Sequence, residues 1–599
     1  MRPLAAFFLF FLLACSSSPA DVNPDPIPAV ASMTLDEKIG QLVVVGADGM
    51  FMNEQSPGFQ RLLRLVRERH VSGVIWYSSG VMELAWMSNR LQEAAEIPLL
   101  IVADLEAGIG MRFPDATFFP WAMAVAATGD LALAEAAASA TAEQALLVGI
   151  NQIYAPVADV NNNPDNPVIN VRSFGEDPES VADFVAATIR GIQSQGALAT
   201  AKHFPGHGDT TTDSHRSLAV LEASRERIES LELIPFRAAI ESGVAAIMPA
   251  HLSVPSLDPT PAPVRGVPQK NNPYHVDEAE VTRSGTWPAS LSRPIIEGIL
   301  RGELGYRGLI VADALDMGGI GHHFETGEAA VRAIEAGNDQ VLKPADPDRA
   351  IDALKTAVIE GRLSEARIDA SVERILAAKR RIKAVPYDPA AIFRSFDSPE
   401  YRQLGAEIAS KALTLVREKE GTLPLRRDAR LVHLLVGDFQ EARSPITAFS
   451  SALSSLLATP PVHFAIDRRT PESEIPAILE SIAAADRVLV SFTVRARSGE
   501  GRVSVPPVAL QLFEKIASLE KVPPLIGVSF GTPYLLRDVP SLDTFIAAYG
   551  PQPLMQRAAA RALFGETAMT GRLPVTIPGV VARGFGIMKP AIPRSSTTP

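Results

Sequence analysis

Residues 309–317 read Leu309-Ile310-Val311-Ala312-Asp313-Ala314-Leu315-Asp316-Met317, a short apolar run that ends on a carboxylate. The run is too short for a buried helix and is rich in branched side chains, which favours a strand covered on both faces. A carboxylate in that position needs hydrogen bonds or a function, because an unpaired buried charge is costly. Asp313 is therefore either a reactive group or the cap of a following helix.

Similar runs recur between residues 33 and 385, separated by longer amphipathic stretches. This alternation is typical of βα units around a parallel sheet. We predict a (β/α)8 TIM-type barrel for residues 33–385, with reactive side chains where the strands enter the following loops. A doubly wound open sheet is the alternative, because periodicity does not show closure. The eight expected strands are 42–47, 73–77, 99–104, 152–157, 199–203, 246–250, 309–313 and 340–343.

A second region follows the barrel. Residues 386–400 carry prolines among polar residues and predict a linker. Residues 401–599 predict a smaller C-terminal α/β sandwich domain, with strands at 431–436, 488–492, 525–529 and 545–548 and helices near 474–485 and 552–564. Within the barrel, the excursion from Pro259 to Trp287 between the sixth and seventh strands is long, and such loops are usually functional or disordered.

The N-terminal segment contains the only cysteine of the chain, Cys15. Residues 4–14 form an apolar run shorter than the roughly 20 residues that cross a bilayer, so residues 1–14 predict a secretion signal. Residues 12–15, Leu-Leu-Ala-Cys, resemble the lipobox of bacterial lipoproteins, which implies lipidation of Cys15 and a tether at 15–32. A cleaved ordinary signal with an incidental cysteine is the alternative. We expect an exported, lipid-anchored protein of the cell envelope, at the outer membrane or periplasmic face rather than in the cytoplasm.

Composition excludes several other classes. Lys and Arg number 56 and Asp and Glu number 68, a formal net charge of −12, so the chain has no general basic field for nucleic acid. A single cysteine excludes an intrachain disulfide framework and multi-cysteine metal sites. The oligomeric state is not indicated.

The densest polar cluster runs from Lys202 to His215. It reads Lys202-His203-Phe204-Pro205-Gly206-His207-Gly208-Asp209, then Thr210 to Thr212, then Asp213-Ser214-His215. Asp213 can orient the His215 imidazole from two residues away, which favours acid/base catalysis near neutral pH. A metal site of His203, His207 and Asp209 and a purely structural polar loop are the alternatives. A further loop, residues 159–178, offers Arg172 and several asparagines, which suit a hydroxyl-rich ligand.

These residues resemble the β-N-acetylglucosaminidase branch of glycoside hydrolase family 3. The segment 202–215 resembles the signature of that branch, and the similarity extends over almost the whole mature chain. Supporting segments of the barrel domain are 159–161, 166–169, 172–175, 248–251, 288–292 and 312–315; those of the second domain are 529–534, 547–549, 562–566 and 571–574.

The resemblance implies a retaining glycosidase. Asp313 would be the nucleophile and His215, paired with Asp213, the acid/base. Asp104, Arg172, Lys202 and His203 match the sugar-binding positions of the family. No metal or organic cofactor is implied. Two features depart from the family pattern: Ala107 stands where glycine is usual, and the stretch from Pro259 to Trp287 is longer than usual.

We therefore expect an exo-β-N-acetylglucosaminidase acting on peptidoglycan fragments or chitin-type oligosaccharides. A β-glucosidase or β-xylosidase of the same family is one alternative, and it would take its acid/base from the second domain. Phosphorolysis is another, because an imidazole does not repel phosphate as a carboxylate does. An inactive glycan-binding lipoprotein is the alternative from a different class.

Overall fold

The computed structural model describes residues 27–47, 51–263, 285–396, 398–437, 446–496 and 503–592. Cys15, the expected signal and most of the tether lie outside these residues, as does most of the stretch from Pro259 to Trp287. Within the described part of the chain, no helix is both long and apolar enough to cross a membrane.

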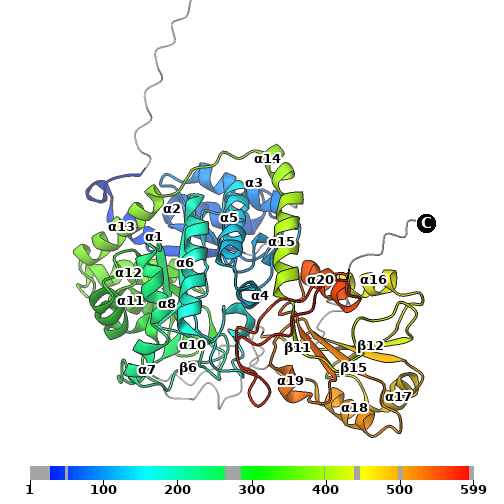
Figure 1. Ribbon diagram of the computed structural model, residues 1–599. Helices are drawn as coiled ribbons and strands as arrows, with labels where there is room; N and C mark the ends of the chain where they lie inside the picture. Colours follow the sequence, from blue (N-terminus) through cyan, green and yellow to red (C-terminus); the bar gives the residue numbers. More distant parts are fainter. Residues whose placement is uncertain are drawn as a thin grey trace, which may run out of the picture.

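Eight parallel strands close into a barrel, so the predicted (β/α)8 fold is confirmed and the open sheet is wrong (Figure 1). The strands follow one another around the barrel in chain order, and the last pairs with the first. They are β1 (Val43–Ala47), β2 (Gly73–Trp76), β3 (Leu100–Ala103), β4 (Gln152–Ile153), β5 (Leu198–Phe204), β7 (Ala246–Pro249), β9 (Leu309–Ala314) and β10 (Gln340–Leu342). A two-stranded sheet of β6 (Ala219–Val220) and β8 (Leu252–Ser253) lies in the loops.

Helices surround this barrel and begin at recognisable caps. Thr34 and Glu37 form a capping box at the first helix. At the helix that begins with Pro178, the preceding residue Asp177 accepts a hydrogen bond from the Ser180 N–H. The helices are α1 (Leu35–Gln41), α2 (Pro57–Glu68), α3 (Val81–Ala94), α4 (Ala122–Ala127), α5 (Leu131–Leu147), α6 (Pro178–Ser194), α7 (Arg225–Ser230), α8 (Ile234–Glu241), the π-helical η5 (Pro294–Glu303), α10 (Gly318–Gly321), α11 (Thr326–Ala336), α12 (Pro347–Ile359) and α13 (Glu365–Arg380), with short 3-10 turns η1 (Val30–Ser32), η2 (Ile109–Met111), η3 (Asn170–Arg172) and η4 (Ala289–Leu291).

The segment predicted as a linker contains a helix. α14 (Pro389–Ser395) and α15 (Pro399–Ala412) connect the barrel to the second domain, and α15 runs from the side of the barrel to that domain (Figure 1). Both helices have proline in their first turn, where its missing N–H costs no helical hydrogen bond.

The C-terminal domain is a six-stranded sheet between helices. Its strand order is β11-β16-β15-β14-β12-β13, and only β11 is antiparallel to its neighbour. The strands are β11 (Thr414–Arg417), β12 (Leu431–Val436), β13 (Val462–Ile466), β14 (Arg487–Phe492), β15 (Leu525–Ser529) and β16 (Thr544–Ala547); the helices are α16 (Thr447–Leu456), η6 (Glu472–Glu474), α17 (Ile475–Ala483), α18 (Pro507–Ala517), α19 (Leu535–Asp538) and α20 (Pro553–Leu563).

The two domains share a hydrophobic core. Trp121, Ala124 and Val171 of the barrel domain pack into the core of the second domain. Polar contacts also cross the interface: the Asn161 amide donates to the Tyr534 hydroxyl at 2.9 Å, and the Thr576 hydroxyl donates to Glu176 at 2.6 Å. The second domain is therefore fixed against the loops that surround the mouth of the barrel.

Candidate active site

A pocket opens where the barrel strands end. It is lined from the ends of β2, β3, β4, β5, β7, β9 and β10, as expected for the functional face of a (β/α)8 barrel. All four expected sugar-binding residues line it, together with Asp313 and His215. They are joined there by Tyr77, Glu106, Arg112, Trp121, Tyr154, Met248, Asp316, Lys343, Arg495 and others.

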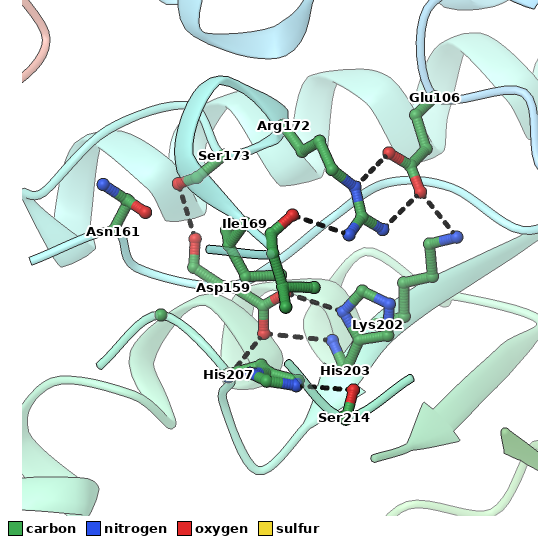
Figure 2. Close-up of polar contacts among 12 residues, drawn as sticks. Glu106, Asp159, Asn161, Ile169, Arg172, Ser173, Lys202, His203, His207 and Ser214 are labelled. Carbon is green, nitrogen blue, oxygen red and sulfur yellow. Dashed lines mark hydrogen bonds and ion pairs between the residues drawn. The ribbon is translucent and has the colours of Figure 1, made fainter. Parts of the chain in front are cut away.

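One wall of the pocket is a buried network of opposite charges (Figure 2). Lys202 Nζ lies 2.7 Å from a carboxylate oxygen of Asp104 and 2.7 Å from one of Glu106. Arg172 donates two hydrogen bonds to Glu106, both at 2.8 Å, and Arg112 donates to Asp104 at 2.8 Å. Such paired geometry offsets the desolvation of each charge.

These pairs keep the carboxylates ionised despite their burial. Burial alone would raise the pKa of Asp104, but Lys202 and Arg112 lower it to about 2. For Glu106, Arg172 and Lys202 likewise outweigh burial and hold the pKa well below its usual value. The wall therefore presents fixed acceptors and donors to the pocket, an arrangement suited to sugar hydroxyls.

Asp159 forms hydrogen bonds with two of the histidines, His203 and His207. Its side chain is fully buried and accepts hydrogen bonds from the backbone N–H groups of His203 at 3.1 Å and His207 at 2.7 Å. It also lies 2.7 Å from His203 Nδ1, which directs the other ring nitrogen of His203 away from Asp159 (Figure 2). The orientation of the His203 ring at the pocket is thus set by a carboxylate from the loop that follows the neighbouring strand β4.

Asp313 lies at the end of β9 and accepts from the Ala314 N–H at 2.8 Å. Burial favours its neutral form, but the positive charge that the nearby His251 ring carries in acid and the hydrogen bond from the Ala314 N–H outweigh burial, so the pKa of Asp313 is lowered. A carboxylate that is ionised and lines the pocket can act as a nucleophile. Asp316 lines the same pocket but lies 2.9 Å from Lys343, which neutralises it.

His251 is hydrogen-bonded to the end of β9, the strand that carries Asp313. Its Nε2 lies 2.9 Å from the carbonyl oxygen of Ala314, so this nitrogen carries a proton and donates. Its Nδ1 is then the acceptor for the Ser290 hydroxyl at 2.7 Å. Burial lowers the pKa of His251, which keeps the ring in this neutral form.

The Asp213–His215 contact expected from their spacing is present. Asp213 Oδ1 lies 2.9 Å from both the backbone nitrogen and the ring Nδ1 of His215. The Asp213 side chain is buried, whereas that of His215 is 23% exposed and lines the pocket. Because Nδ1 is held by the carboxylate, Nε2 is the ring nitrogen suited to exchange a proton with a ligand.

The residues of the alternative metal site have other partners. Asp209 pairs with Arg227 at 3.0 Å, and the two ring nitrogens of His207 lie within hydrogen-bond distance of Thr210 and Ser214. Among the described residues, no group of three or more His, Cys, Asp or Glu side chains is arranged to hold a metal ion. The polar cluster 202–215 is thus divided between pocket residues and residues that support the loop.

Sequence reasoning missed Glu106, and it did not predict that Asp159 and His251 orient neighbouring groups of the site. Glu106 follows Asp104 by two residues, so it could have been found by the strand-end argument. Ala107, which stands where the family pattern has glycine, is buried, and the positive φ of 83° in this turn falls on Gly108. The second domain reaches the site, because Arg495 and Ala496 line the pocket.

A closed (β/α)8 barrel with an ionised carboxylate, an Asp–His pair and a polar wall in one pocket is the architecture of a glycosidase-type enzyme. The model of the glycosyl hydrolase family 3 N-terminal domain matches residues 34–378, and that of the family 3 C-terminal domain matches residues 413–590. The chain belongs to glycosyl hydrolase family 3.

Individual relatives agree with this assignment. A beta-N-acetylglucosaminidase/beta-glucosidase of Cellulomonas fimi is 30% identical over 583 residues, which cover 94% of this chain and 98% of the relative. The solved structure of a family 3 beta-N-acetylglucosaminidase from Paenibacillus sp. str. FPU-7 has a TM-score of 0.76 at 34% identity and covers 91% of this chain and 99% of its own. A solved beta-glucoside phosphorylase has a TM-score of 0.77 at 26% identity, with 92% and 95% coverage.

Proposed function

We propose that the chain is an exo-acting, retaining β-N-acetylglucosaminidase that releases terminal β-linked N-acetylglucosamine from peptidoglycan fragments or chitin-type oligosaccharides. The observation that carries this proposal is the Asp213–His215 pair in the same pocket as the ionised Asp313. The names of the Cellulomonas and Paenibacillus relatives support the choice of sugar.

In the first step an Asp313 oxygen attacks the anomeric carbon and forms a glycosyl ester, while the bond from that carbon to the leaving oxygen breaks. The proton on His215 Nε2 passes to the leaving oxygen. In the second step water attacks the anomeric carbon, gives a proton back to His215 Nε2, and Asp313 departs as a carboxylate. Asp213 holds Nδ1 and stabilises the positive charge that the ring carries while Nε2 is protonated, before the first step and after the second.

The four sugar-binding residues would hold the terminal sugar over Asp313. Lys202 is buried and is paired with Asp104, whose side chain is 16% exposed, so the two offer hydrogen-bonding groups without first reorganising. Arg172 is fixed by Glu106 and His203 by Asp159, which places their remaining donors or acceptors toward the pocket. Contacts of this kind give the orientation that retaining chemistry needs.

Phosphorolysis is a second candidate, favoured by the similarity to a beta-glucoside phosphorylase and by the imidazole in place of a second carboxylate. A β-glucosidase or β-xylosidase that uses an acid/base of the second domain is less favoured. Among the described residues of that domain, those that line the pocket are Arg495 and Ala496, and neither is a carboxylate.

We also propose that the chain is exported and lipid-anchored through Cys15 in the cell envelope. The support is the lipobox-like sequence of residues 12–15 after an apolar run. Anchorage outside the cytoplasm suits substrates that occur there.

The experiment is turnover by the purified Cys15→Ala protein on aryl β-N-acetylglucosaminide, β-glucoside and β-xyloside, each in phosphate and in phosphate-free buffer. We expect the β-N-acetylglucosaminide to be used at least about tenfold better and the product to be the free sugar. Preference for glucoside or xyloside would overturn the assigned sugar, sugar 1-phosphate would establish phosphorolysis, and no turnover would favour a binding protein.

A further inference from the structure

Residues 213–217, called here the acid/base loop, lie against the segment that follows Asp313. The backbone N–H of Gly318 donates to the carbonyl oxygen of His215 at 3.1 Å, and that of Gly319 donates to the carbonyl oxygen of Ser214 at 3.1 Å. Gly318 is only five residues beyond Asp313, at the start of α10. The acid/base loop is therefore hydrogen-bonded to the chain segment that carries the nucleophile.

His207 holds the same loop from another side (Figure 2). The Thr210 hydroxyl donates its one hydrogen to the His207 carbonyl oxygen at 3.1 Å, so it accepts from His207 Nδ1 at 2.7 Å. Nε2 is then unprotonated and accepts from the Ser214 hydroxyl at 2.9 Å. Burial lowers the pKa of His207 to about 4, which keeps this neutral form at neutral pH.

The contact with the two glycines leaves no room for a side chain. A Cβ on Gly318 would lie 2.4 Å from the carbonyl oxygen of Arg216 and 2.6 Å from that of His215. A Cβ on Gly319 would lie 3.0 Å from the Ser214 carbonyl oxygen. Neither glycine is among the residues with positive φ, so close approach of the acid/base loop, not backbone conformation, is what requires glycine here.

We propose that His207, Gly318 and Gly319 are positioning residues that fix the His215 imidazole relative to Asp313. The inference rests on the proposed acid/base function of His215. Each residue from 213 to 215 makes its own restraining hydrogen bond. The Asp213 carboxylate contacts the His215 ring, and the Ser214 hydroxyl contacts His207. The backbone carbonyls of Ser214 and His215 accept from the N–H groups of Gly319 and Gly318. Because a displacement near 1 Å can cost about 100-fold in rate, such restraints set the efficiency of proton transfer.

The test is Gly318→Ala, which forces the loop away by several tenths of an ångström while every catalytic side chain keeps its chemical identity. We expect kcat/KM for an N-acetylglucosamine disaccharide, whose leaving group needs protonation, to fall about 10- to 100-fold. Release of nitrophenolate in a single-turnover burst should fall much less, and azide, which needs no base, should partly restore steady-state turnover of the nitrophenyl glycoside.

The matched control is Gly298→Ala in η5, where a Cβ meets nothing within 4 Å. It should leave kcat/KM unchanged for both the disaccharide and the nitrophenyl glycoside. Ser214→Ala, which removes only the bond to His207, should show the same selective pattern more weakly and keeps the test decisive if Gly318→Ala does not fold.

His215→Ala separates the two possible failures. If His215→Ala itself slows both substrates equally and azide has no effect, the proposed acid/base function is wrong. Suppose instead that His215→Ala slows turnover of the disaccharide more than that of the nitrophenyl glycoside. The positioning role is then wrong if Gly318→Ala and Ser214→Ala change turnover no more than Gly298→Ala does, or slow turnover of both substrates equally.

Discussion

Glu106 pairs with two cations of the polar wall, Arg172 and Lys202, so Glu106→Gln tests this network without changing side-chain size. Its carboxylate is 3% exposed and accepts from Arg172 twice, at 2.8 Å each, with Lys202 at 2.7 Å. Glu106 and Asp104 form ion pairs with Arg112, Lys202 and Arg172, and the substitution removes one of these two carboxylates. It also places an amide N–H₂ against groups that can only donate.

Breaking a buried ion pair by removing one partner costs about 3–5 kcal/mol, because the remaining charge stays buried. We expect Glu106→Gln to lower the free energy of unfolding in urea by that amount. We also expect KM for the aryl β-N-acetylglucosaminide to rise, because Arg172 and Lys202 lose the group that orients them.

Glu229→Gln is the control, because Glu229 pairs with Arg225 at 2.7 Å on the surface, with side chains 41% and 45% exposed. It should cost less than about 1 kcal/mol and leave KM unchanged. Equal and small effects of the two substitutions would refute the view that the network supports the pocket.

Three other outcomes are expected. Cys15→Ala should move the full-length protein from the membrane fraction to the soluble fraction at unchanged specific activity, and continued membrane attachment would refute lipidation at Cys15. Asp213→Asn should weaken proton transfer more for a disaccharide than for an aryl glycoside, because the imidazole keeps its place but loses its negative partner; equal slowing would argue against that role. The depressed pKa of His207, about 4 against an ordinary 6.5, means that the unfolded chain binds a proton that the folded chain does not, so stability is full above 6.5 and falls as the pH drops toward 4. His207→Gln should therefore remove up to about 3 kcal/mol of the acid-induced loss, measured by urea unfolding at about pH 7.5 and about pH 4.5; an unchanged difference between the two pH values would contradict this.

The sequence predicts the barrel strands well because each is buried on both faces and appears as a short apolar run between amphipathic stretches. β13 was not predicted because it is an edge strand whose side chains are mostly exposed, and β11 was not predicted because it follows the helix α15 almost directly. Pro389 and Pro399 suggested a linker, yet each begins a helix, since proline in the first turn loses no hydrogen bond.

The site residues also divide into those that local sequence predicts and those that it does not. Asp104, Lys202, His203 and Asp313 were predictable from strand ends, and Asp213 with His215 from spacing, because these are local features of the chain. The roles of Asp159 and His251 in orienting their neighbours were not, since each depends on a contact between different loops or strands. The roles assigned to Asp313, His215 and the sugar-binding residues remain predictions for experiment.

The central claim is that Asp313 becomes covalently bound to the sugar, and trapping the intermediate tests it most directly. An activated fluoro-sugar that forms the glycosyl ester quickly and releases it slowly should add the mass of one sugar to the intact protein. Peptide mapping should place that mass on Asp313, and Asp313→Asn should abolish both the label and turnover. A label on Asp316 or on a carboxylate of the second domain, or full turnover by the Asp313→Asn protein, would contradict the account.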